Sequence, residues 1–142
     1  MTLHADHERL NKLISSMRTA YGLLAELAAI PDDKFLKDNH KISSAKYNFV
    51  AAIEAVIDIS NHLISRNKLR APQDYADTFS VLHEAGILEK KFAAELMKAA
   101  RFRNRLVHLY WDVDPKELHG ILKTRLSDLD KFLVETGKHI RL

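Results

Sequence analysis

The sequence predicts an all-α protein, an up-and-down bundle of four main helices with one additional short helix. Two observations carry this prediction. The 142 residues contain only four glycines and three prolines, so few positions interrupt a helix. Apolar residues recur at intervals of three and four over long stretches, which is the period of a helix with one buried face. Short connections between such helices are typical of antiparallel neighbours in one bundle.

A proline separates the first two long helices. The first is expected over residues 6–30, with one apolar face, and Pro31 ends it. After a short piece through residues 35–36, a second long helix is expected over residues 39–67. Its apolar surface is wide enough to contact more than one neighbour, so we expect it to be buried against two elements.

Glycine and proline punctuate the second half of the chain. Residues 67–77 contain Pro72 and several turn formers, and they predict an irregular connection. A short helix follows and is expected to end at Gly86, because glycine readily takes the left-handed conformation beyond a helix C-terminus. Another long helix is expected over residues 89–109.

The last helix is expected to begin at Asp114 and Pro115. Aspartate caps free amides, and proline suits the first helical position. One amphipathic helix is then expected to reach about Glu135, and Gly137 and the basic tail are expected to fray. The length and the 46% hydrophobic content fit a single domain over residues 1–142.

Composition excludes several classes of protein. The chain has no cysteine, which rules out disulfides and thiolate zinc sites and is compatible with a reducing compartment. No apolar run approaches the ~20 residues needed to cross a bilayer, and residues 2–9 are too polar for a signal-peptide core. We therefore expect a cytoplasmic protein with no membrane association.

Positive charge is concentrated rather than abundant. The net charge of +3 is too small to identify a nucleic-acid binder by itself. A solvated helix face is the simpler interpretation of the cluster, and an anionic partner is the alternative. Six cations fall within sixteen positions, with only Glu95 opposing them: Lys90, Lys91, Lys98, Arg101, Arg103 and Arg105.

The segment RFRNRLVHLY, residues 101–110, brings four polar groups together in the order R-N-x3-H-x-Y. Arginine stays protonated and presents a planar fork to phosphate, whereas histidine titrates near ~6.5 and can donate or accept a proton. Such groups suit phosphodiester chemistry: in RNA cleavage by the neighbouring 2′-hydroxyl, for example, His108 could transfer protons and Arg103 could stabilise phosphoryl charge. Asn104 could orient a ligand or the imidazole, and Tyr110 could bind a phosphate oxygen or stack on a base.

Helical geometry limits how these side chains combine. At ~100° per residue, Arg103 and Tyr110 would lie within ~20° of each other, and His108 would lie ~140° from Arg103. The arginine could wrap around the helix, the helix could distort before Trp111, or a second copy of the chain could complete the site. A single histidine also leaves either the acid or the base role unfilled, and a two-fold homodimer would fill both.

The order of the motif residues closely resembles the signature of the HEPN ribonucleases, in particular the HepT-like toxins. These toxins are encoded beside a minimal nucleotidyltransferase antitoxin. The resemblance extends from about Leu23 to Leu133. It includes AAIEAVIDISNHLI at residues 51–64, AGI at 85–87, FRNRLVHLY at 102–110 and VDP at 113–115.

This resemblance implies a HEPN-like fold, a helical homodimer and RNA cleavage without a metal or a cofactor. It implies that Arg103 and His108 are catalytic and that Asn104 is the polar residue that usually follows the arginine. Tyr110 would be the tyrosine that the partner nucleotidyltransferase modifies with AMP, which blocks the toxin. Many relatives carry a small residue at the position of Arg101, so Arg101 could add a phosphate contact or obstruct the cleft.

Five further residues invite interpretation. Asp58 and His62 lie four apart on the second long helix, close enough for a hydrogen bond or half a metal site. A structural pair is the simpler interpretation, no metal site is expected, and Asp58 could instead help to place the motif's cations. Arg105 is another supporting candidate. Glu54 is expected to pair with a cation, and Trp111 is expected to be a packing anchor more readily than a surface for RNA.

The leading hypothesis is an endoribonuclease toxin that cleaves RNA as a homodimer. One alternative is a non-catalytic helical module that binds nucleotide or RNA and assembles with a nucleotidyltransferase. A second is a purely structural subunit whose dimer surface is its function. The substitution His108→Ala separates the catalytic hypothesis from the first alternative, and His108-dependent RNA cleavage in EDTA would exclude the second.

Overall fold

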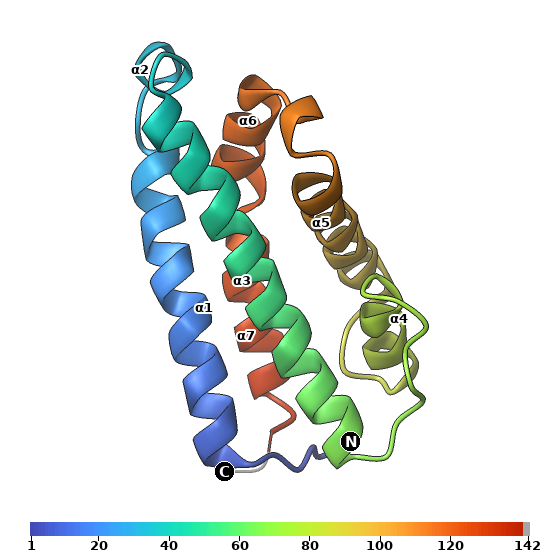
Figure 1. Ribbon diagram of the computed structural model, residues 1–142. Coiled ribbons are helices and arrows are strands. Elements are labelled where there is room, and N and C mark those ends of the chain that lie inside the picture. The colour runs from blue at the N-terminus through green and yellow to red at the C-terminus, as the bar shows by residue number, and fades with distance from the viewer. Residues whose placement is uncertain (141–142) are drawn as a thin grey trace.

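The computed structural model describes residues 1–140 as a bundle of antiparallel helices, which confirms the predicted all-α fold (Figure 1). The long helix α3 (Asn39–Arg66) is flanked by α1 (His7–Ala28) on one side and by α5 (Lys90–His108) on the other. Behind them, α6 and α7 follow one another along the bundle (Figure 1). The remaining elements are α2 (Asp32–Leu36), α4 (Asp77–Glu84), the 3-10 helix η1 (Tyr110–Asp112), α6 (Pro115–Arg125) and α7 (Ser127–Gly137).

Local capping explains where the helices begin and end. The Asp6 carboxylate accepts a hydrogen bond from the Arg9 backbone amide at 3.1 Å. The Asp38 carboxylate accepts from the backbone amides of His40 and Lys41 in the first turn of α3. Asp114 caps α6 in the same way, with proline at the first helical position, as predicted. Gly86 follows α4 with φ of +80°, which confirms the predicted left-handed stop.

The prediction of one continuous last helix is wrong at Leu126. There the regular hydrogen bonding is interrupted, although Leu126 keeps helical angles of φ −59° and ψ −35°. The Leu129 amide donates to the carbonyl of Leu126, three residues back, at 3.1 Å. Just before the break, the Thr124 hydroxyl donates to the Gly120 carbonyl at 2.8 Å, a local bond that tends to bend a helix.

The predicted fraying of the C-terminal tail is also wrong as far as Ile140. The Leu3 amide donates to the His139 carbonyl at 2.6 Å, and Leu3 and Ile140 form an isolated parallel bridge. Leu3 is fully buried, so this contact closes the bottom of the core. The last two positions of the predicted tail, 141 and 142, lie outside the described residues.

The core lies around α3, which contacts α1 and α5 and also the shorter helices, so the predicted burial against two elements is confirmed. At the α2 end, His119 is buried and stacks on Phe35 with 4.1 Å between ring centroids. Its two ring nitrogens lie 2.7 Å from the Asp32 carboxylate and 3.1 Å from the Leu27 carbonyl. Within residues 1–140, no helix is both long and apolar enough to cross a membrane.

Candidate active site

The last two turns of α5 form one wall of an open hollow of about 500 Å³. We call it the motif hollow. It is lined by Asp74, Tyr75, Arg103, Asn104, Val107 and His108. One chain therefore brings together three of the predicted site residues, the arginine, the asparagine and the histidine. The offset of ~140° between arginine and histidine does not separate them, because Asn104 and Val107, which lie between them around the helix, line the same hollow.

Arg103 is the most constrained side chain of the motif hollow. It is only 9% exposed, and its Nη2 atom donates to Glu54 Oε1 on α3 at 2.5 Å. Its Nη1 atom donates to Asn104 Oδ1 at 3.0 Å, and the ring of Tyr75 lies over the guanidinium carbon at 4.8 Å. The pairing of Glu54 with a cation was predicted and is confirmed.

One donor of the Arg103 guanidinium remains unmatched. Its Nε atom is buried and has no hydrogen-bond partner in the described part of the chain. Buried polar groups are nearly always paired in folded proteins, so such an atom marks strain or a functional position. Asn104 and Glu54 hold the other two nitrogens, which leaves the guanidinium plane fixed at the edge of the hollow.

His108 is the last residue of α5, and its side chain is exposed. No hydrogen bond of its imidazole to another side chain or to the backbone is found within residues 1–140. Both ring nitrogens are therefore available to a ligand in the motif hollow. Each chain supplies one such histidine.

Tyr110 does not share a face with Arg103, contrary to the prediction from helical angles. The helix ends at His108, because Leu109 leaves the helical region with φ −129° and ψ 43°, and Tyr110 begins η1. The buried Lys46 of α3 holds this turn: its Nζ atom donates to the Tyr110 carbonyl at 2.8 Å and lies 4.1 Å from the ring centroid. Tyr110 is thus adjacent to the hollow in sequence but is not part of its lining.

The prediction that Trp111 is a packing anchor is wrong within the single chain. Its side chain is 89% exposed, and its ring makes an edge-to-face pair with that of Tyr110, with 4.9 Å between ring centroids. The 3-10 turn carries Trp111 off the apolar stripe of α5, which explains the exposure. Leu109, which lies between the end of α5 and this turn, is also half exposed.

Half of the six cations in the basic cluster are paired with acids within residues 1–140: Lys98, Arg103 and Arg105. Arg105 donates to both carboxylate oxygens of Glu117 at 2.8 and 3.2 Å, which ties α5 to α6 and raises the pKa of Arg105 further above its ordinary value. Lys98 pairs with Glu95 at 3.3 Å. Arg101 is exposed and does not line the motif hollow, so it leaves the hollow unobstructed in the single chain.

Asp58 and His62 do not form the predicted structural pair. His62 Nε2 instead accepts a hydrogen bond from the Asp6 amide at 2.9 Å, which ties the start of α1 to α3. Burial and then the nearby Arg66 lower the pKa of His62. Asp58 makes no ion pair with a motif cation in the described chain, and partial burial beside the Glu54 carboxylate raises its pKa. No three His, Asp or Glu side chains within residues 1–140 are grouped closely enough to hold a metal ion.

Sequence reasoning missed three residues at this end of the molecule. Asp74 and Tyr75 come from a segment without periodicity, where the only signal was an aromatic residue between turn formers. Lys46 lies on the buried face of α3 beside Ala45 and Phe49, but polar residues such as Ser44 and Asn48 surround it in the sequence, so no pattern signalled its buried position.

A second, apolar pocket of about 190 Å³ lies on a different side of α5 from the motif hollow. Glu95, which pairs with Arg125 at 3.4 Å, lies at its charged border. Its apolar lining comes from α3, α5, α6 and α7: Phe49, Ile53, Ala99, Phe102, Ile121 and Leu129.

The sequence and the fold are similar to those of known proteins. Residues 17–136 match the family model described as ribonuclease HepT-like. The mRNA nuclease HepT of Shewanella oneidensis is 27% identical over 100 residues, which cover 70% of this chain and 75% of that protein. The tRNA nuclease HepT of Aphanizomenon flos-aquae is 36% identical over 89 residues, 61% of this chain and 59% of that protein. A solved structure of the tri-AMPylated Shewanella oneidensis HEPN toxin in complex with the MNT antitoxin superposes with a TM-score of 0.84 at 22% identity, over 91% of this chain and 96% of that chain.

Proposed function

The chain belongs to the ribonuclease HepT-like family and is an enzyme of the ribonuclease class, and from this premise we propose that it is an endoribonuclease toxin. It acts in the cytoplasm as a homodimer, cleaves RNA without a metal, and is blocked when a nucleotidyltransferase antitoxin transfers AMP to it. The observation that carries the proposal is the shared position of Arg103, Asn104 and His108 along the motif hollow.

The reaction follows from the chemistry of these groups. His108 takes the proton of the ribose 2′-hydroxyl, whose oxygen attacks the adjacent phosphorus and forms a 2′,3′-cyclic phosphate. The bond from phosphorus to the 5′-oxygen breaks, and that oxygen receives a proton from an acid. Arg103 stabilises the charge on the phosphoryl oxygens, and its fixed plane means that little reorganisation is needed during the reaction.

A second copy of the chain supplies the missing acid. Each chain has a single histidine in its motif hollow, so a two-fold dimer that brings two hollows together would provide one base and one acid. Three exposed apolar side chains at the end of α5 support such an interface, because a dimer would remove them from water: Val107 at 44% exposed, Leu109 at 52% and Trp111 at 89%.

Tyr110 is the proposed acceptor of AMP. Its hydroxyl would attack the α-phosphorus of ATP bound to the nucleotidyltransferase and release pyrophosphate, and the phenolic proton would pass to a base of that enzyme. Lys46 holds the turn that carries Tyr110, so the acceptor lies in a defined place just beyond the hollow. A bulky anion there would repel RNA phosphates and obstruct their approach.

Cleavage of RNA by the purified chain in EDTA tests the proposal. The wild-type protein is expected to give products with cyclic phosphate ends, and His108→Ala to slow cleavage by at least about 100-fold. His40→Ala is the matched control, since His40 is exposed on the first turn of α3, away from the hollow. Equal cleavage by the wild type and by His108→Ala would contradict the proposal.

One observation favours a second candidate, a non-catalytic module that binds RNA or nucleotide. Arg103 is 9% exposed, and two of its nitrogens are already engaged within the protein. That arrangement also fits a purely structural arginine. The module would arrest growth and bind RNA equally well with and without His108, so the same His108→Ala variant, compared in a growth assay, decides between the two.

A further inference from the structure

The loop between α3 and α4 contributes a chemically distinct part of the motif hollow. Asp74 and Tyr75 line it beside the arginine and the histidine of α5. Tyr75 is 43% exposed, with one part of its ring against the Arg103 guanidinium. The proposed reaction uses neither loop residue, yet both are accessible to whatever enters the hollow.

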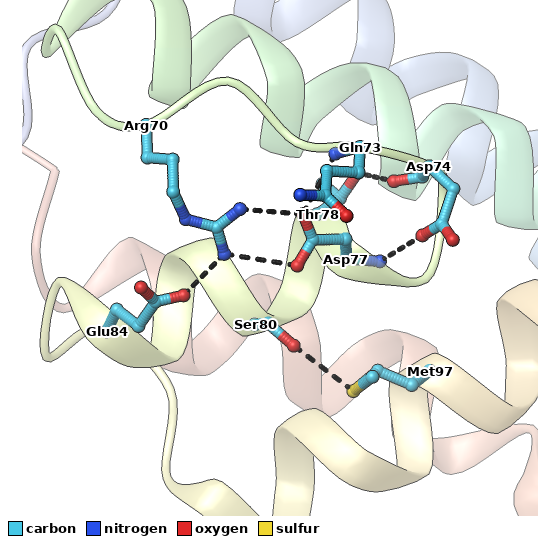
Figure 2. Close-up of polar contacts among 8 residues, drawn as sticks. All are labelled: Arg70, Gln73, Asp74, Asp77, Thr78, Ser80, Glu84 and Met97. Atoms are coloured by element: carbon cyan, nitrogen blue, oxygen red, sulfur yellow. Dashed lines mark hydrogen bonds and ion pairs between the residues drawn. The ribbon is translucent and has the colours of Figure 1, made fainter.

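A network of charged groups holds this loop in place (Figure 2). Arg70 donates to both carboxylate oxygens of Asp77, at 2.7 and 3.1 Å, and to Glu84 at 2.5 Å. The backbone amide of Gln73 donates to the Asp77 carboxylate at 2.8 Å. These bonds connect the loop to both ends of α4, so the segment that carries Asp74 and Tyr75 is held in a fixed position.

The Asp74 carboxylate has one oxygen engaged and one free. Its Oδ1 atom accepts from the Asp77 amide at 2.7 Å, as Figure 2 shows. Its Oδ2 atom has no donor within residues 1–140, and the side chain is exposed. The bound oxygen fixes the group, and the second oxygen can accept a hydrogen bond from a ligand.

The charges in the hollow dictate how a nucleotide would lie there. A phosphate is attracted to Arg103 and His108 and is repelled by the carboxylate of Asp74. An aromatic ring such as that of Tyr75 offers a flat surface on which any base can stack. The base therefore belongs at the loop and the phosphate at α5.

We propose that Asp74 and Tyr75 form a base-recognition subsite for the nucleotide next to the scissile phosphate, and that it prefers bases with an exocyclic amino group. The inference rests on the proposed action on RNA. A free carboxylate oxygen only accepts hydrogen bonds, and adenine, cytosine and guanine offer amino donors. Uracil has no amino group, and its single N–H lies between two carbonyl oxygens that repel a carboxylate.

The test measures binding of short RNA to the full-length His108→Ala protein, so that cleavage does not interfere. Fluorescence anisotropy with labelled hexamers of adenylate, cytidylate and uridylate should show adenylate and cytidylate bound about five- to tenfold more tightly than uridylate. Adding Tyr75→Leu should weaken all three by about tenfold, and adding Tyr75→Phe should leave them unchanged.

The variant Asp74→Asn separates base reading from a structural role. Asparagine keeps the oxygen that accepts from the Asp77 amide, so the loop should stay folded, but it replaces the free oxygen with an amide donor. The tighter binding of adenylate and cytidylate should then disappear, or uridylate should become the preferred hexamer. Asp33→Asn, an exposed carboxylate on α2, removes the same charge away from the hollow and should leave the preference as it was.

Three results would overturn the inference. They are equal binding of the three hexamers, no measurable binding of any of them, or an unchanged preference in Asp74→Asn. Failure of the proposed function is seen separately, as a wild-type protein that cuts no RNA. Cleavage of RNA without a base preference would contradict the proposed subsite but not the proposed function.

Discussion

Glu54 of α3 holds Arg103 of α5 across the edge of the motif hollow, with 2.5 Å between its Oε1 atom and the guanidinium Nη2. The acid is 46% exposed at its side chain, whereas that of the arginine is only 11% exposed. Loss of the acid therefore leaves a nearly buried cation with fewer partners. The pair fixes the direction in which the arginine faces the hollow.

Glu54→Ala is accordingly expected to lower the free energy of unfolding by about 1 kcal/mol. The effect is no larger because solvent screens the partly exposed carboxylate. RNA cleavage should fall by roughly 10- to 100-fold, because Arg103 loses its fixed orientation. Chemical denaturation and a cleavage assay measure the two effects. Glu8→Ala, which removes an exposed pair with Lys12, should change stability by less than about 0.5 kcal/mol and leave cleavage intact.

Lys46 is expected to control the turn that carries Tyr110. Lys46→Met keeps most of the side-chain length but removes the donor to the Tyr110 carbonyl, which should cost about 1–2 kcal/mol of stability. Trp111 is the only tryptophan and lies against Tyr110, so its fluorescence anisotropy should fall as the turn loosens. Lys41→Met removes the ion pair with Asp38 at the start of α3 and serves as the control. Unchanged tryptophan anisotropy in Lys46→Met would contradict this role.

The Arg70–Asp77 pair is expected to make stability sensitive to acid. The Arg70 guanidinium and then the Gln73 amide lower the pKa of Asp77 from 3.8 to about 2. Because the folded pKa is lower than the unfolded one, the pair stabilises the fold fully above about pH 4 and loses its effect as the pH falls towards 2. A double-mutant cycle with Arg70→Gln and Asp77→Asn, measured by urea unfolding, should give a coupling energy that shrinks over this range. A coupling energy independent of pH would contradict it.

The apolar pocket beside α5 offers room for a larger side chain. Ala99 lines this pocket of about 190 Å³, so Ala99→Leu should raise the unfolding free energy by about 1 kcal/mol. Ala100 is fully buried and does not line the pocket, and Ala100→Leu should destabilise by about 1–3 kcal/mol through overpacking. Thermal unfolding of the two variants compares them directly. The expectation fails if both variants lose stability.

The helices were predictable because local signals act over a few residues. Asp114 and Pro115 start a helix, and Gly86 ends one, through backbone chemistry that needs no distant partner. The break at Leu126 was not predictable in the same way, since its backbone angles stay helical and only the hydrogen bonds change. The spacing of apolar residues does not reveal an interruption of that kind.

The candidate site was predictable only in its residue types. The arginine and histidine were identified from one segment, but the length of α5 decides which of their neighbours share a wall with them. Assuming a regular helix past His108 put Tyr110 on the same face as Arg103, whereas the helix ends at His108, two residues before Tyr110. Asp74 and Lys46 lie in other parts of the chain, and their places depend on packing between helices.

The end of α5 at His108 also affects how the proposed inhibition would be undone. Tyr110 belongs to a separate turn, so a group on its hydroxyl adds bulk outside the wall that carries Arg103 and His108. We expect the helix and the motif hollow to stay folded while AMP is attached. Hydrolytic removal of AMP would then restore activity at the rate of that removal, with no refolding step. A cell would then keep folded, inhibited enzyme that regains activity without new synthesis.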